Sequence, residues 1–146
     1  MNQKHYTCLE NMYLNAKVNA ITFEGTNIKI EEEKAIIGLP VHPNYFHALE
    51  AVHGSVYFKL LDDACFFAVN SIVEDVFVLT TNFNINLIRP VNQGYIEAIG
   101  KVKFASKNTF LAEATLFNEE GKEIGFGTGT FRKSKVALNS DIGYKL

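Results

Sequence analysis

The chain has 146 residues and a mass of 16.4 kDa, which suits one domain with a substantial core and excludes two domains of ordinary size. With 47% hydrophobic and 21% charged residues and a formal net charge of -2, it lacks the composition of a disordered chain and the basic excess of a dedicated nucleic-acid binder. No apolar stretch approaches the roughly 20 residues that cross a bilayer, and the N-terminal segment is too polar for a signal peptide. We therefore expect a soluble, cytoplasmic protein of one domain, residues 1–146, that binds neither nucleic acid nor membrane.

The first predicted elements are a helix, an extended stretch and a second helix, in that order. Over residues 6–19, apolar side chains recur every three or four positions, which predicts a weakly amphipathic helix. Residues 28–41 are mostly extended, and the acidic run at residues 31–33 predicts a solvated edge or turn. Residues 56–71 contain few helix breakers and are apolar on nearly every side, so we expect a helix that is buried from all directions.

Strands are predicted after this helix, because the apolar period changes there to two residues. Between Phe77 and Leu87, apolar side chains alternate with Thr80 and three asparagines, which predicts a strand over residues 76–88 with one buried and one polar face. A hairpin joins the last two of three further strands, predicted at residues 95–104, 109–117 and 123–132. The last strand has glycines along one face, where another backbone or a helix can approach closely: Gly125, Gly127 and Gly129.

This order of elements predicts an α+β fold, in which one curved, mostly antiparallel sheet wraps around a central buried helix. The core is expected over about residues 25–132, with the extra helix 6–19 before it and a loosely ordered tail, 134–146, after it. The two cysteines, Cys8 and Cys65, are far apart, and the four histidines lack metal-ligand spacing. We therefore expect neither a disulfide framework nor a metal site.

A possible catalytic constellation lies at the start of the buried helix and within it. Gly54 follows His53 just before this helix, where free backbone N–H groups and the helix dipole favour negative charge, as an oxyanion hole requires. Asp62 lies roughly two turns further on, between two phenylalanines at four-residue spacing. A carboxyl group in apolar surroundings has a raised pKa and can serve as a general base or nucleophile. The pattern leaves open which of Asp62 and Asp63 has this role and which faces solvent or pairs with Lys59.

The motif His-Gly-x7-Asp-x-Ala, at residues 53–64, resembles the hotdog-fold acyl-CoA thioesterases, in particular the phenylacetic-acid-degradation (PaaI-like) type. Thr80-Thr81 and the strand ending LIRP at residues 87–90 extend the resemblance, which covers about residues 25–132. It implies a hotdog fold for this region and a thioester hydrolase activity.

The resemblance also implies a role for each residue that matches the motif. Gly54 would donate its N–H to the thioester carbonyl, and His53 would support that geometry. Asp62 would activate water or attack the thioester, and Thr80 would orient the water. His47 occupies a position where the family usually has Asn or Gln; it can still donate a hydrogen bond, and its protonation would make activity dependent on pH.

Four further residues are expected to contribute to substrate binding: Ser55, Asp63, Thr81 and Phe58. Ser55 replaces the family's usual second glycine, and serine there either acts as a neutral helix cap or narrows the channel for the thioester. No cofactor is expected beyond the coenzyme A that forms part of the substrate.

The expected function is hydrolysis of an acyl-CoA or acyl-carrier-protein thioester to a free acid and a thiol. Two alternatives remain: an acyl-thioester hydratase or dehydratase on the same fold, and a non-catalytic acyl-CoA binding module. The resemblance implies an active site between two subunits, one supplying His47, His53 and Gly54 and the other Asp62 and Thr80. The 12 phenylalanines agree with this, since so much apolar surface in a small domain favours a homo-oligomer, either a dimer or a dimer of dimers.

Overall fold

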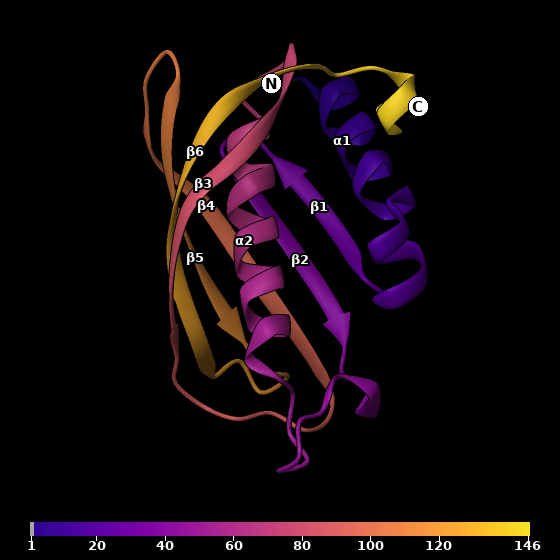
Figure 1. Ribbon diagram of the computed structural model, residues 1–146, viewed down its shortest axis with the longest axis vertical. Helices are drawn as coiled ribbons and strands as arrows, with labels where there is room; N and C mark the ends of the chain where they lie inside the picture. Colours follow the sequence, from indigo (N-terminus) through magenta and orange to yellow (C-terminus); the bar gives the residue numbers. More distant parts are fainter. Residues whose placement is uncertain (1) are drawn as a thin grey trace.

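The computed structural model describes residues 2–146, and its largest element is a sheet of six strands (Figure 1). The strands are β1 (Asn27–Glu31), β2 (Lys34–Pro40), β3 (Val76–Leu87), β4 (Tyr95–Ala105), β5 (Thr109–Phe117) and β6 (Glu123–Ala137). Their order across the sheet is β1-β2-β4-β5-β6-β3, and all neighbouring strands are antiparallel. Strand β3 therefore forms one edge of the sheet and β1 forms the other.

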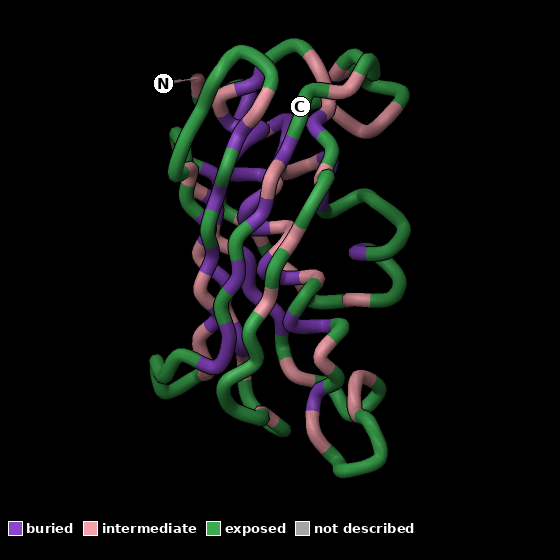
Figure 2. Tube along the Cα trace, turned by 60° about the vertical axis from the view of Figure 1, so that its left-hand side comes forward, coloured by how far each residue is buried: buried purple, intermediate pink, exposed green. Residues whose placement is uncertain are grey.

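Helix α2 (Gly54–Asn70) packs against the concave face of the sheet and contacts all six strands, whereas α1 (Gln3–Asn15) lies beside β1 (Figure 1). Most side chains of α2 are buried, but the helix is not buried from all directions, contrary to what its apolar composition predicts. Phe58 is 40% exposed, and Asp62 and Phe66, one and two turns further along the same face, are only partly buried. Along the strands, buried positions alternate with exposed ones (Figure 2). The predicted α+β arrangement is thus confirmed. No described helix is long and apolar enough to cross a membrane.

The N-terminal helix begins and ends earlier than its apolar spacing predicts. It begins at Gln3 because the Asn2 side chain caps it, accepting a hydrogen bond from the His5 N–H at 3.2 Å. After Asn15 the chain continues into a π-helical turn, Val18–Thr22. This turn packs beside α1 on the same side of α2, where Asn19 accepts a hydrogen bond from Lys59 of α2.

The extended stretch predicted over residues 28–41 consists of two strands, β1 and β2, joined by a tight turn. The acidic run lies at this turn, where Glu33 has a left-handed φ of 60°. The Ser71 hydroxyl accepts a hydrogen bond from the Glu33 N–H at 2.8 Å and so ties the turn to the end of α2. The prediction that the acidic run forms a turn is therefore confirmed. The extended stretch is a hairpin of two strands and not one continuous strand.

Strand β3 does not keep the single alternation that its sequence predicts. A bulge shifts its register against β6 between Thr80 and Asn82. Before the bulge Val78 is fully buried, whereas Leu79, predicted to face inward, is 49% exposed. One extra residue in a strand exchanges its two faces. Thr80 consequently points toward α2 rather than lying on the polar face, and the inward positions after the bulge begin at Phe83.

The C-terminal residues are packed against the domain, so the prediction of a loosely ordered tail from residue 134 is wrong. Strand β6 continues to Ala137, and a 3-10 turn, Ser140–Ile142, follows it beside α1 (Figure 1). The Tyr144 hydroxyl lies 2.7 Å from Nδ1 of the buried His5. This segment is held in place because three of its apolar side chains pack against the hydrophobic core: Leu138, Ile142 and Tyr144.

The glycines on one face of β6 permit close packing, as predicted, but mainly by an aromatic ring. A Cβ at Gly127 would lie 2.6 Å from the ring of Phe83, and one at Gly129 would lie 2.7 Å from the same ring. Phe83 belongs to the neighbouring strand β3, and its ring lies over the glycine face of β6. The glycines of β6 therefore make room for an inward-facing aromatic side chain beside α2.

The closest approach of α2 to the sheet occurs at Gly100 in β4. A Cβ there would overlap the Ala64 carbonyl and lie 2.7 Å from the Cys65 nitrogen. Because these are backbone atoms in a buried helix, they cannot move aside, and we expect Gly100→Ala to lower the free energy of unfolding by about 3 kcal/mol. Urea denaturation would measure this loss. Gly121→Asn is the control, because that turn has open space and asparagine tolerates its φ of 79°; equal losses in the two variants would contradict the prediction.

Candidate active site

The start of α2 presents a free backbone donor beside two histidines. His53 is the N-cap, and its Nδ1 accepts a hydrogen bond from the Ser55 N–H at 3.0 Å. Gly54 is the first residue of the helix, so its N–H has no acceptor one turn earlier. Within residues 2–146 no other protein atom accepts this N–H. The helix dipole adds partial positive charge at this point, so the donor is suited to a developing oxyanion.

His47 lies next to His53 in a cleft at this end of the helix. The two imidazole rings have their centroids 6.3 Å apart, and both side chains are exposed. His47 Nδ1 accepts a hydrogen bond from the Leu49 N–H at 3.1 Å, which leaves Nε2 free to donate. The cleft has a volume of about 610 Å³, and residues at the end of β3 and just after it complete its walls: Leu87, Ile88, Arg89 and Pro90.

Asp62 lies in the middle of α2 and faces β3. The Thr80 hydroxyl donates a hydrogen bond to Asp62 Oδ1 at 2.9 Å. Burial raises the pKa of Asp62 to about 6, against the opposing effect of the Thr80 hydrogen bond, and the neighbouring charge of Asp63 raises the pKa further. A carboxylate with this pKa is mostly ionised at neutral pH and is a stronger base than an exposed aspartate, which suits proton removal from water.

Asp63 points toward α1 instead. Its Oδ2 lies 2.6 Å from the Lys59 ammonium and accepts a hydrogen bond from the Tyr13 hydroxyl at 2.8 Å. Lys59 also donates to Asn19 Oδ1 at 2.6 Å. The pairing with Lys59 that the sequence left open therefore belongs to Asp63, and the carboxylate with a raised pKa belongs to Asp62. Substrate binding by Asp63 stays a prediction.

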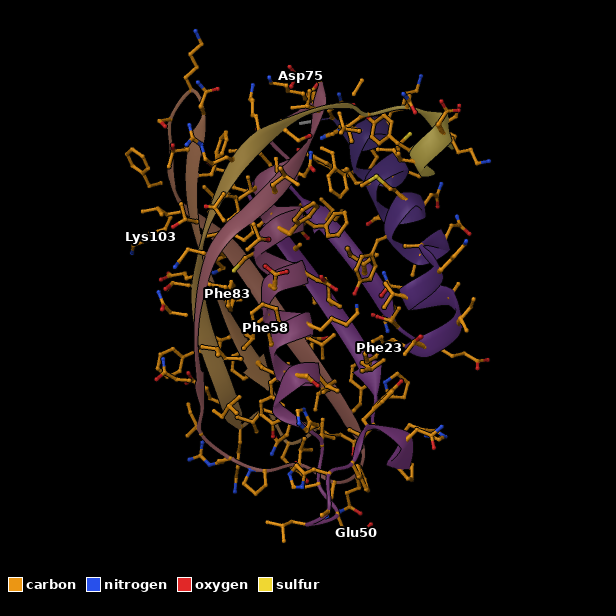
Figure 3. All side chains as sticks on the ribbon, viewed as in Figure 1. Phe23, Glu50, Phe58, Asp75, Phe83 and Lys103 are labelled. Carbon is orange, nitrogen blue, oxygen red and sulfur yellow. The ribbon has the colours of Figure 1, made fainter. Side chains whose placement is uncertain are left out.

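The remaining predicted residues lie around these two groups. The Ser55 hydroxyl lies 2.8 Å from His53 Nδ1. Thr81, at the bulge, is exposed, and its hydroxyl donates to the Thr130 carbonyl at 3.1 Å. Phe58 packs edge-on against Phe83, with ring centroids 5.3 Å apart, in the space between α2 and β3 (Figure 3).

Within one chain the predicted site residues form two separate groups. His47, His53 and Gly54 line the cleft at the start of α2, whereas Asp62 and Thr80 line a second cavity, between α1, α2 and β3. Asp62 comes eight residues after Gly54 in the helix, which amounts to roughly 12 Å along the axis. A small thioester group cannot contact both within a single chain.

Sequence reasoning missed the residues that α1, the π-helical turn and the C-terminal turn contribute around Asp62: Met12, Tyr13, Asn19 and Ile142. No local pattern marks them as neighbours of Asp62, because that proximity depends on contacts between distant parts of the chain. No three His, Cys, Asp or Glu side chains of the described chain are placed to share a metal ion.

A curved antiparallel sheet around a long central helix, with a free N–H where the helix begins, defines a hotdog-fold protein. The sequence profile of the Thioesterase superfamily matches residues 49–124. The chain belongs to this superfamily. None of the curated protein sequences matches it.

Solved structures confirm the fold. The chain is similar to the PaaI protein of the E. coli phenylacetic acid degradation operon, with a TM-score of 0.82, 22% identity, and coverage of 93% of this chain and 97% of that one. A thioesterase family protein from Silicibacter pomeroyi superposes with a TM-score of 0.80 at 22% identity, covering 88% and 96% of the two chains. A thioesterase from Haemophilus influenzae has a TM-score of 0.74 at 21% identity, covering 84% and 85%.

Proposed function

We propose that this protein is a thioesterase that hydrolyses an acyl thioester of coenzyme A, or of an acyl carrier protein, to a free acid and a thiol. The observation that carries the proposal is the Asp62 carboxylate, which is half-buried in the central helix, hydrogen-bonded by Thr80 and raised in pKa to about 6. The membership of the Thioesterase superfamily supports it. The cytoplasmic location stays a prediction.

In this mechanism the thioester carbonyl lies at the start of α2. The Gly54 N–H and the helix dipole stabilise the negative charge on the carbonyl oxygen as the tetrahedral intermediate forms. Asp62 takes a proton from the attacking water and returns it to the sulfur as the carbon–sulfur bond breaks. Alternatively, it attacks the carbonyl itself and expels the thiolate, which leaves a transient anhydride that water hydrolyses to the free acid and the Asp62 carboxylate. His47 and Thr80 orient the carbonyl and the water.

The separation of the two groups within one chain supports a site shared between subunits. Strand β3 is a 12-residue edge strand, and its apolar side chains Leu79 and Leu87 are 49% and 57% exposed. A long unpaired edge is a template for pairing with a second chain. Antiparallel β3–β3 pairing about a two-fold axis would place the two α2 helices side by side in opposite directions, which brings the start of one toward the second half of the other.

Subunit mixing tests the shared site. Co-expression of Asp62→Asn and Gly54→Pro chains with different tags is expected to restore thiol release to about a quarter of the wild-type rate, although each variant alone is at least about 100-fold slower than the wild type. With random pairing, about half of the dimers are hybrids, and each hybrid contains one site with both residues intact. Inactive hybrids, isolated through both tags, would show that Gly54 and Asp62 do not act across an interface.

The hydrogen bond from Thr80 is expected to set the pH dependence of hydrolysis. Since Asp62 must be ionised to act as a base, kcat/KM rises with pH through the pKa of Asp62, near 6. Thr80→Val removes a hydrogen bond that favours the ionised form of Asp62. The acidic limb of the pH profile of kcat/KM therefore moves to higher pH, by roughly one pH unit. Thr81→Val is the matched control and leaves the limb in place. Identical limbs in all three proteins would mean that Thr80 does not tune Asp62.

The proposed function itself is tested by a thiol-release screen over acyl-CoA thioesters of different chain lengths and over aromatic acyl groups. Release of free thiol and free acid in equal amounts is the expected result. Conversion of an enoyl-CoA to a hydroxyacyl-CoA without free thiol would identify a hydratase instead. Tight acyl-CoA binding by calorimetry, with no turnover of any substrate, would identify a binding module.

A further inference from the structure

The cavity beside Asp62 has a volume of about 320 Å³, which is within the range of small-molecule sites. Apolar side chains form most of its walls: Met12, Val18, Phe66, Phe67, Phe77 and Ile142. Asp62 and Thr80 also line it. An apolar group in this cavity would therefore lie against the carboxylate that the proposed mechanism uses.

The other polar groups on the cavity wall are bonded to one another. The Lys59 ammonium donates to Asp63 at 2.6 Å, to Asn19 at 2.6 Å and to the Tyr13 hydroxyl at 3.2 Å, which uses all three of its N–H groups. The Tyr13 hydroxyl in turn donates to Asp63. Because these groups satisfy each other, the wall offers a ligand mainly aromatic and hydrocarbon surface. Such a wall suits an apolar group better than a sugar, a phosphate or a peptide.

We propose that this cavity holds the acyl group of the thioester and that the two ends of the chain determine how long that group can be. The inference rests on the proposed thioesterase function. Of the lining residues, Met12 and Val18 come from the N-terminal segment and Ile142 from the C-terminal turn, all outside residues 49–124 that match the superfamily. The apolar acyl group is thus selected in part by segments outside the matched region.

A hydrogen-bonded contact between the chain ends holds Ile142 at the cavity. The Tyr144 hydroxyl lies 2.7 Å from His5 Nδ1, and His5 Nε2 lies 2.8 Å from the Asn70 carbonyl. Since a carbonyl only accepts, Nε2 is the donor nitrogen, and Nδ1 accepts from the tyrosine. This chain of bonds connects the C-terminal turn, α1 and the end of α2, and so fixes the side of the cavity formed by Ile142.

Two substitutions change the cavity without touching the proposed catalytic groups. Val18→Phe adds bulk at a side chain that is 47% exposed and so has room to adjust, and Ile142→Ala removes bulk from the opposite end of the chain. The matched controls are Val136→Phe and Ile21→Ala, at side chains that are 51% and 73% exposed and do not line the cavity. All four proteins are compared with wild type in kcat/KM for straight-chain acyl-CoAs from acetyl to decanoyl, and for phenylacetyl-CoA.

In the wild type we expect kcat/KM to rise about fourfold per methylene until the cavity is full, which corresponds to about 0.8 kcal/mol for each buried CH₂. Val18→Phe should end this rise at a shorter chain and lower kcat/KM for the best wild-type substrate about tenfold, with acetyl-CoA unaffected. Ile142→Ala should extend the rise to longer chains. The phenylacetyl arm shows whether an aryl group is accepted in the same space.

The outcomes separate this inference from the proposed function. If the wild type releases thiol from no acyl-CoA, the thioesterase proposal is wrong. If the wild type is active but Val18→Phe and Ile142→Ala keep the chain-length profile of their controls, the acyl group lies elsewhere and the inference is overturned. Thermal unfolding of each variant identifies any that fails to fold, and in that case the other variant still decides the matter.

Discussion

Asp62→Asn is expected to lower kcat for thioester hydrolysis by about 10³-fold, because an amide cannot take a proton from water or attack the carbonyl. Asparagine has nearly the same shape as aspartate and still accepts the hydrogen bond from Thr80, which spans 2.9 Å in the native protein. The loss should therefore appear in kcat, with little change in KM. A thiol-release assay under saturating substrate measures it.

The same substitution should stabilise the protein at neutral pH. The pKa of Asp62 is raised from 3.8 to about 6 by burial, so its charged form is disfavoured in the folded state by at most about 3 kcal/mol. Because the carboxylate is partly solvated, we expect Asp62→Asn to gain about 1–2 kcal/mol above pH 6. Below about pH 4 the carboxyl is protonated in both the folded and the unfolded chain, and the gain should vanish.

Asp75→Asn provides the matched control for both effects. Asp75 is 70% exposed and 3.7 Å from the Lys133 ammonium, a surface pair that contributes at most about 1 kcal/mol. Its replacement should leave kcat unchanged and should not stabilise the protein. If Asp62→Asn hydrolyses acyl-CoAs as fast as the wild type, Asp62 is neither the catalytic base nor the nucleophile, whatever happens to stability.

Gly54→Pro should lower kcat/KM by about 10²- to 10³-fold, the usual effect of removing one oxyanion donor. Proline lacks the backbone N–H, and the first position of a helix is the position that accepts proline best. His53, the preceding residue, has φ -63° and ψ 143°, a conformation that suits a residue before proline. The substitution thus removes the donor and preserves the helix.

Gly54→Ala is the control, because it keeps the N–H and adds the same Cβ. In both variants that Cβ meets Leu87 Cδ1, 2.9 Å from its ideal position and at the end of a flexible side chain. Steady-state kinetics on the same thioester compares the three proteins, and circular dichroism verifies their helix content. Equal rates in the proline and alanine variants would remove Gly54 from the oxyanion hole.

Elements that are set by neighbouring residues in the chain could be predicted from the sequence more accurately than features that depend on tertiary contacts. The range predicted for β5, residues 109–117, agrees with the structure, and the buried helix predicted over residues 56–71 agrees with α2 to within two residues. Both follow from the types of neighbouring residues: the helix from a long segment that has few breakers and is apolar on nearly every side, the strand from a short segment bounded by turns. The bulge in β3 has no such signature, and it placed Thr80 on the opposite face from the one predicted.

The sequence by itself determined the α+β class, the buried helix and the motif that places Gly54 before it and Asp62 within it. These features depend on residue type and spacing along the chain. Only the tertiary structure decided that Asp63 pairs with Lys59 and that Asp62 bonds to Thr80. This depends on α1 and the π-helical turn after it: the Tyr13 hydroxyl donates to Asp63, and Asn19 accepts from Lys59. Contacts such as that between His5 and Tyr144, 139 residues apart, leave no periodic trace in a sequence, because they depend on how separate elements pack against each other.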